Sequence, residues 1–234
     1  MWNYYGYTYR SKKPVDVEKE IAKLRKKNPH IEPVQIEGRN ISVTWWGQAW
    51  NHNLEQYADF ATRIGRGRSY VRAGKVLDLQ LGPGMVHAQV IGQKLYKTDI
   101  LIEPLAKEKW DKIVSAAGRS IHSLEELAEG RFPKALAELF TSQKQGLFPS
   151  PKEIKFSCSC PDWAVMCKHV AAVLYGIGNR FDRDPTLFFQ LRNIDFALLL
   201  KRSLEEKLTG MLDNADNKTA RVIENADISK LFNI

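Results

Sequence analysis

All three cysteines of this 234-residue chain lie in one short segment, together with a histidine. Cys158 and Cys160 are one residue apart, so on an extended strand both thiols point to the same face. Cys167 and His169 follow after a Pro-Asp turn, where an apolar run typical of a helix begins. Three sulfurs and one imidazole form a closed, tetrahedral Cys₃His zinc site with no position for a reactive water. The spacing therefore predicts that these four side chains bind Zn²⁺.

The same spacing disfavours other chemistry at these thiols. A disulfide would leave one of three cysteines unpaired, and Cys158 and Cys160 are too close in sequence for a relaxed bridge. A catalytic cysteine beside a histidine is the remaining alternative, but no separate acid or oxyanion-stabilising group is evident. The chain also shows no pattern of paired carboxylates. We therefore expect a binding protein and not an enzyme.

The ligand segment resembles a known family. Its pattern Cys-x-Cys-x₆-Cys-x-His is similar to the SWIM zinc finger, in particular to that of stand-alone bacterial SWIM proteins. The resemblance runs from about Trp45 to Asp195. It implies that the three cysteines and His169 bind zinc, that the protein binds DNA or protein, and that a helicase-like ATPase is a partner. Outside the ligand segment it includes Trp45-Trp46-Gly47, Ala49-Trp50 and Leu147-Phe148-Pro149-Ser150.

An α+β fold is expected to position these ligands. Residues 154–157 predict the strand that delivers Cys158, and the apolar run after His169 predicts a helix. Residues 75–81, 85–91 and 95–105 predict three strands joined by glycine-containing turns, which is typical of an antiparallel meander. The sequence thus indicates an N-terminal antiparallel sheet with helices, followed by a small zinc module packed on C-terminal helices.

Further elements are predicted on both sides of the sheet. Residues 41–46 read as a strand, and helical spacing of apolar residues covers 15–27, 48–64 and 194–212. The three tryptophans near residue 45 are expected in the core and not as a platform for bases. Gly, Pro and Ser at 143–151 suggest a boundary before the zinc module. The expected divisions are a basic aromatic N-terminal segment (1–40), an α+β domain (41–145), the zinc module (146–180) and C-terminal helices with a polar tail (181–234).

The formal net charge of +8 is concentrated near the N-terminus. Residues 1–75 hold 14 Lys and Arg against 7 Asp and Glu, whereas the rest of the chain is nearly balanced. Three thiolates and one Zn²⁺ would add a net charge of −1, so the zinc module by itself is not strongly basic. Tyrosines alternate with other residues in 1–13 before a basic cluster. This alternation favours a strand or partner-docking segment over base stacking.

A cationic run over residues 63–75 is the second candidate site. Glycines flank Arg66 on both sides, which predicts a flexible or tightly turning segment. If the following residues are extended, Arg68, Tyr70 and Arg72 share one strand face. Guanidinium groups suit phosphate oxygens, although an acidic partner protein would use them equally well. The candidate nucleic-acid contacts are Arg63, Arg66, Arg68, Arg72, Lys75 and Lys168.

Two functions follow from these features. The first is a zinc-binding, nucleic-acid-binding accessory protein in a DNA transaction, with DNA favoured over RNA. The second is an adaptor that docks a helicase-like ATPase without direct nucleic-acid contact. The first residues lack the pattern of a signal peptide, and no apolar run approaches transmembrane length. We therefore expect a protein of the bacterial cytosol or nucleoid, and clustered free thiols agree with a reducing compartment.

Overall fold

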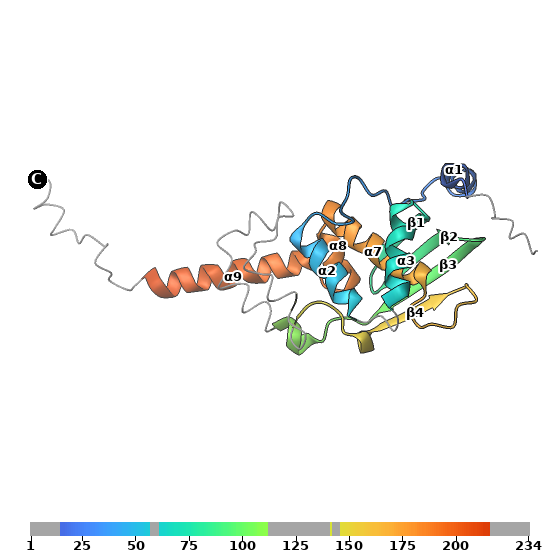
Figure 1. Cartoon of the computed structure of the whole chain (residues 1–234). Coiled ribbons are helices and arrows are strands. Elements are labelled where there is room, and N and C mark those ends of the chain that lie inside the picture. The colour runs from blue at the N-terminus through green and yellow to red at the C-terminus, as the bar shows by residue number, and fades with distance from the viewer. Residues whose placement is uncertain (1–14, 57–60, 112–140, 142–145, 216–234) are drawn as a thin grey trace, which may run out of the picture.

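A four-stranded antiparallel sheet carries the first metal-ligand strand on its edge (Figure 1). The computed structural model describes residues 15–56, 61–111, 141 and 146–215. The strands lie in sequence order, and every neighbouring pair is antiparallel, which confirms the α+β class and the predicted meander. They are β1 (Val76–Gly82), β2 (Met85–Ile91), β3 (Leu95–Ile102) and β4 (Ile154–Cys158).

The sheet has one buried face and one exposed face, as alternating side chains require. On β3, Tyr96, Thr98 and Ile100 are buried, whereas Lys97 between them is exposed. β4 pairs with β3 so that Cys158 lies opposite Thr98. The predicted strand over 154–157 is therefore correct, and it places the first thiol beside the buried row of β3.

One helix, α7 (Lys168–Arg183), packs against the buried face of the sheet. It also contacts α2 (Trp45–Glu55) and α3 (Ala61–Arg72), so it lies between the sheet and these two helices (Figure 1). Most of its residues from His169 to Phe181 are buried. Because both sides of α7 are covered, its position determines where the residues at its first turn point.

The contact between α3 and α7 depends on a glycine. A Cβ added at Gly67 would lie 2.5 Å from the Cβ of Ala171 and 3.0 Å from its carbonyl carbon. Gly65, two residues earlier on the same helix, has no atom within 4 Å of the equivalent position. Glycine in a helix costs conformational entropy, and at Gly67 the close helix packing offsets that cost.

Aromatic rings fill the space where α2 meets α7. Trp50 is fully buried, and its Nε1 donates to the carbonyl of Leu174 at 3.0 Å. Phe148, Phe181 and Phe188 pack edge-to-face on its ring, with centroids 5.2 to 6.4 Å away. The prediction of a tryptophan in the core is thus confirmed at Trp50, while Trp45 and Trp46 are half-buried against the same cluster.

The remaining described helices lie at the two ends of the chain. α1 (Val17–Lys27) and α9 (Phe196–Ala215) agree with the predicted helices over 15–27 and 194–212, and α8 (Thr186–Leu191) packs against α7. In Figure 1, α9 extends away from the sheet and from α7. Across the described parts of the chain, none of the helices has both the length and the apolar character that crossing a bilayer requires. The tyrosine-rich residues 1–13 lie outside the described residues, and the division at residues 40, 145 and 180 stays a prediction.

The predicted strand over residues 41–46 is wrong. Thr44 is the N-cap of α2, and its Oγ1 accepts a hydrogen bond from the amide of Gly47 at 3.2 Å. The Thr44 hydroxyl in turn donates to the carboxylate of Asp182 on α7. This long-range anchor makes the chain turn into a helix where its β-branched and aromatic residues favour a strand. The bounds predicted for the following helix, 48–64, are also wrong, because α2 ends at Glu55 and α3 begins at Ala61.

A buried ion pair joins the start of β4 to the end of α8. Arg192 is fully buried, and its guanidinium donates to Glu153 Oε1 and to the carbonyl of Glu103, each at 2.7 Å. Burial raises the pKa of Glu153, but hydrogen bonds from Arg192 and Ser150 outweigh it and lower the pKa to about 2. The ion pair therefore ties the strand that carries Cys158 to the C-terminal helices.

Gly67→Ala tests the close packing of α3 on α7. We expect it to lower the free energy of unfolding by about 1 to 3 kcal/mol, since the new methyl overlaps Ala171. The matched control Gly65→Ala fills open space on the same helix and should stabilise the protein by about 0.5 to 1 kcal/mol. Urea unfolding followed by circular dichroism measures both values. Equal effects of the two substitutions would contradict the close-packing argument.

Glu153→Gln tests the buried ion pair. We expect a loss of about 3 kcal/mol at neutral pH, because a buried guanidinium loses its counter-charge. The pKa of Glu153 is lower in the folded protein than the ordinary 4.5, so its contribution is complete above pH 4.5 and decreases as the pH falls toward 2. The difference in unfolding free energy between wild type and variant should shrink over that range. Glu103→Gln, which removes an exposed carboxylate 3.8 Å from Lys155, should change stability by less than about 1 kcal/mol.

Candidate metal centre

β4 and α7 bring the four predicted ligands together. Cys158 is the last residue of β4, Cys160 lies in the turn that follows, Cys167 is the N-cap of α7, and His169 lies in its first turn. Their ligand atoms all lie within 4.8 Å of one another. The sheet thus supplies one pair of ligands and the helix supplies the other.

The distances fit a tetrahedral zinc site. Nδ1 of His169 lies 3.8 Å from the Sγ atoms of both Cys158 and Cys167. Bond lengths of about 2.3 Å to sulfur and 2.0 Å to nitrogen would place these atoms about 3.6 Å apart around one ion. Nδ1 is therefore the imidazole atom that faces the metal position.

Packed aromatic rings hold the imidazole of His169 in place. Its ring lies 4.5 Å from that of Tyr96 on β3 and 5.4 Å from that of Tyr70 on α3. A Cβ at Gly92 would come within 3.0 Å of both His169 Nε2 and the Tyr96 ring, so the absence of a side chain there leaves room for both. Cys167 and His169 are 1% exposed, whereas Cys158 and Cys160 are half-buried.

The thiols influence one another strongly. A hydrogen bond with Cys167 lowers the pKa of Cys158 to about 3, and the same contact raises the pKa of Cys167. Burial raises the pKa of Cys160. Opposite shifts at neighbouring sulfurs mean that they compete for protons. A divalent cation removes this competition, because it stabilises all three as thiolates.

Groups around the cluster favour the thiolate form. Thr98 Oγ1 donates to Cys158 Sγ at 3.5 Å, and the amide of Val170 donates to Cys167 Sγ at the same distance. The second contact is the N-cap hydrogen bond of α7, where the helix dipole also favours negative charge. Bound zinc would be held by Cys158, Cys160, Cys167 and His169 and would join β4 to α7 as a structural ion.

The cationic run forms neither the flexible or tightly turning segment predicted from its glycines nor a strand. Residues 61–72 form α3, so successive side chains are rotated by about 100°. Arg68 and Arg72 therefore share one face, and Tyr70 points elsewhere. The expectation that Arg68, Tyr70 and Arg72 share a strand face is wrong, because packing of Gly67 on α7 stabilises a helix.

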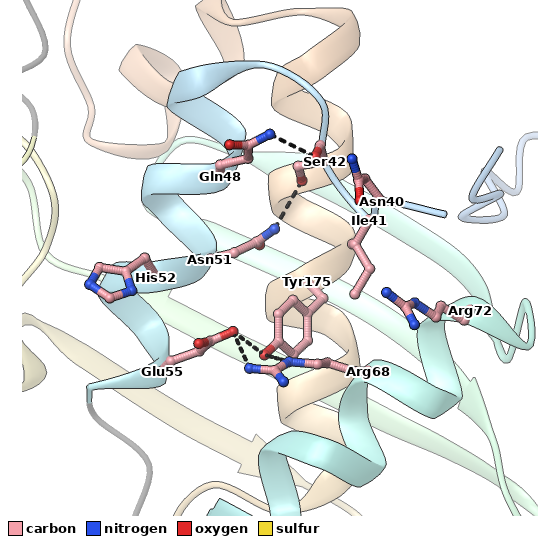
Figure 2. Close-up of a pocket in the computed structure, with 10 residues that line it drawn as sticks. All are labelled: Asn40, Ile41, Ser42, Gln48, Asn51, His52, Glu55, Arg68, Arg72 and Tyr175. Carbon is pink, nitrogen blue, oxygen red and sulfur yellow. Dashed lines mark hydrogen bonds and ion pairs between the residues drawn. The ribbon is translucent and has the colours of Figure 1, made fainter. Parts of the chain in front are cut away.

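Arg68 and Arg72 line a polar cavity between α2, α3 and α7 of about 510 Å³ (Figure 2). Arg68 pairs with Glu55 at 2.6 Å and donates from Nε to the hydroxyl of Tyr175 at 2.7 Å. That hydroxyl donates to Glu55 at 2.7 Å. Arg72 donates to the carbonyl of Arg39 at 3.0 Å. These two predicted phosphate contacts thus have partners within the protein.

The other predicted contacts lie toward the metal centre. Arg63 forms an ion pair of 3.1 Å with Asp162 in the loop between the ligand pairs. Lys75 and Lys168 place their Nζ atoms 4.4 and 5.8 Å from the ring centroid of Tyr70. Arg66 is exposed one helical turn before Tyr70. The six predicted nucleic-acid contacts thus fall into two groups. Arg68 and Arg72 line the polar cavity, and the other four lie toward the metal centre.

Tyr70, Tyr96 and Lys94 join this group although they were not among the predicted contacts. Lys94, in the β2–β3 turn, places its Nζ 5.8 Å from the ring centroid of Tyr96. Side-chain alternation on the strand predicted over 95–105 puts Tyr96 on the same face as Thr98 and Ile100, but only the folded chain brings it to His169. We call the surface formed by Arg66, Tyr70, Lys75, Lys94 and Lys168, together with the buried ring of Tyr96 beneath it, the basic aromatic face.

Comparison with known proteins agrees with the geometry. Residues 151–176 match the family model described as SWIM zinc finger, and this range contains all four ligands. The chain therefore carries a SWIM zinc finger, and zinc is the metal that its ligand set fits. No solved structure matches the chain.

The chain is also similar to a bacterial protein from Mycobacterium tuberculosis (strain ATCC 25618 / H37Rv), named Uncharacterized protein Rv2102. The two are 32% identical over 180 residues, which cover 76% of this chain and 65% of the relative. The similarity thus extends well beyond the zinc finger, in agreement with the expected resemblance to stand-alone bacterial SWIM proteins.

Cys167→Ser tests the metal centre. We expect loss of stoichiometric zinc and of the ordered structure between β4 and α7, because metal binding and local folding are one free-energy change at such sites. Elemental analysis measures the zinc, and hydrogen exchange measures the local order. Ser157→Ala, an exposed position one residue before Cys158, should keep both. A folded wild-type preparation with far less zinc than protein would contradict the assignment.

Proposed function

We propose that this chain is a zinc-stabilised nucleic-acid-binding accessory protein in a DNA transaction, with a binding role and not a catalytic one. The basic aromatic face is the observation that supports this proposal. Its cations come from α3, the α3–β1 turn, the β2–β3 turn and the first residue of α7. Four separate parts of the chain thus direct positive charge toward two tyrosine rings beside the metal centre.

The chemistry of this face suits nucleic acid. Lysine and arginine side chains contact phosphates, and tyrosine rings stack on bases. Arg63 is already paired with Asp162, so its role is to hold the loop between Cys160 and Cys167 against α3. The zinc finger then acts as a structural support, because it orients Lys168 and the His169 ring that contacts both tyrosines.

An adaptor that docks a helicase-like ATPase is the second candidate function. The loop between the ligand pairs supports it, since Trp163 is 81% exposed and Val165 is 68% exposed. Exposed aromatic and aliphatic side chains are typical anchors of protein interfaces. A pull-down that recovers such an ATPase with wild type but not with Trp163→Ala would favour this role, provided that the purified protein shows no salt-sensitive nucleic-acid binding.

Salt-titrated binding tests the leading proposal. We expect affinity for labelled DNA to fall steeply between about 50 and 200 mM salt, because each neutralised phosphate releases counterions. Arg66→Ala combined with Lys168→Ala should weaken binding and reduce the slope of log K against log salt by up to about 2. Fluorescence anisotropy with duplex DNA, single-stranded DNA and RNA measures these quantities.

A matched double variant controls for net charge. Lys152→Ala combined with Lys155→Ala removes the same charge from exposed positions at the start of β4. It should leave the affinity and the slope close to those of wild type. If both double variants weaken binding equally, charge alone and not the basic aromatic face is responsible.

A further inference from the structure

A cavity lies within the basic aromatic face, directly beside the metal ligands. Its volume is about 320 Å³, and the residues that line it include Tyr70, Gln93, Tyr96, Cys160 and Lys168. It thus combines aromatic rings, an amide, a cation and a metal-binding sulfur. From this combination we infer that the cavity receives one unstacked nucleobase, so that the protein prefers single-stranded nucleic acid to duplex. This inference rests on the proposed nucleic-acid binding and specifies which part of the ligand enters.

The charge distribution favours a base over a phosphate inside the cavity. With zinc bound, three thiolates give the centre a net charge of −1, and Cys160 lies at the cavity wall. Asp162 also lines the cavity, and its charge is balanced by Arg63 at 3.1 Å. An anion inside would thus lie against a negative centre, whereas the N–H groups of a base can donate to sulfur or to the Gln93 amide.

The cations lie where the backbone of such a ligand would pass. Lys75 and Lys168 lie by the ring of Tyr70, Lys94 lies by the ring of Tyr96, and Arg66 is exposed on α3. A strand with one base inserted would keep its phosphates at the rim, within reach of these side chains. The arrangement therefore separates a site for one base from the sites for its flanking phosphates.

The lysines that now contact the rings do not prevent insertion. An exposed cation over an aromatic ring contributes about 0.5 to 1 kcal/mol, whereas a stacked base contributes about 1 to 3 kcal/mol. A base can therefore displace a lysine from the ring of Tyr70, and the displaced ammonium is then free to contact a phosphate. His169 stays in place, since it is 1% exposed and held by the metal and by both tyrosines.

A duplex cannot supply such a base without cost. Its bases are stacked and paired, and extruding one costs a few kcal/mol. Single strands already present unstacked bases, so the cavity should confer a preference for them. Binding by phosphate contacts alone would give no such preference.

Tyr70→Leu and Tyr70→Phe test the inference on the full-length, zinc-loaded protein. We expect Tyr70→Leu to weaken binding of single-stranded DNA by about 5- to 100-fold without changing the salt slope, because stacking is lost and the phosphate contacts remain. Tyr70→Phe keeps the ring and should bind as wild type does. Stoichiometric zinc in both variants, measured by elemental analysis, shows that the adjacent centre is intact.

A DNA single strand with abasic residues provides a second test, since it keeps every phosphate and lacks the bases. Wild type should bind it no more tightly than Tyr70→Leu binds the normal strand. Adenosine monophosphate, tested by calorimetry, separates the two sources of a base. If it binds and its binding requires Tyr70, a free nucleotide is a sufficient ligand. If it does not bind but single-stranded DNA does, the ligand is a strand.

Two results would overturn the inference while leaving the proposed function intact. One is equal wild-type affinity for normal and abasic strands, and the other is an equal loss for duplex and single strand in Tyr70→Leu. If wild type binds none of the duplex, single-stranded or RNA probes at low salt, the proposed function and this inference both fail.

Discussion

Mutual repulsion of thiolates is the constraint on which this structure depends. Cys158 and Cys160 come from the edge of the sheet and its following turn, and Cys167 comes from the N-terminus of a helix. Their sulfurs, with Nδ1 of His169, gather within 4.8 Å. Three negative charges at that distance are tolerable only around a cation or when protons are shared. One ion would therefore join β4 to α7 across the short loop that separates them.

α7 transmits this constraint to the rest of the protein. Its first turn holds His169, its next turn contacts Gly67 of α3, and Tyr175 one turn further binds Glu55 and Arg68. The same helix thus orients the metal ligand, the basic helix and the polar network shown in Figure 2. Because α7 is buried on both sides, all of these contacts depend on the position of one helix.

The sequence predicted those features that depend on local spacing. Four metal ligands, three strands of the meander and the strand before Cys158 could be predicted because ligand spacing and period-two alternation are local patterns. The course of residues 61–72 could not, since glycine at position 67 reflects contact with Ala171 about a hundred residues later. The same holds for Thr44, whose hydroxyl binds Asp182, and for Tyr96, whose contact with His169 exists only in the folded chain.

The place of β4 in the sheet gives the zinc finger a role beyond holding its own loop. β4 is the last strand in the order β1-β2-β3-β4, and its backbone pairs with β3 from Ile154 to Cys158. Without β4, the amides and carbonyls of β3 would be open to pairing with another chain, which is a common route to aggregation. By fixing the end of β4 to α7, bound zinc would keep β3 covered by its neighbouring strand. Loss of zinc would therefore free not only the ligand loop but also a strand edge on β3.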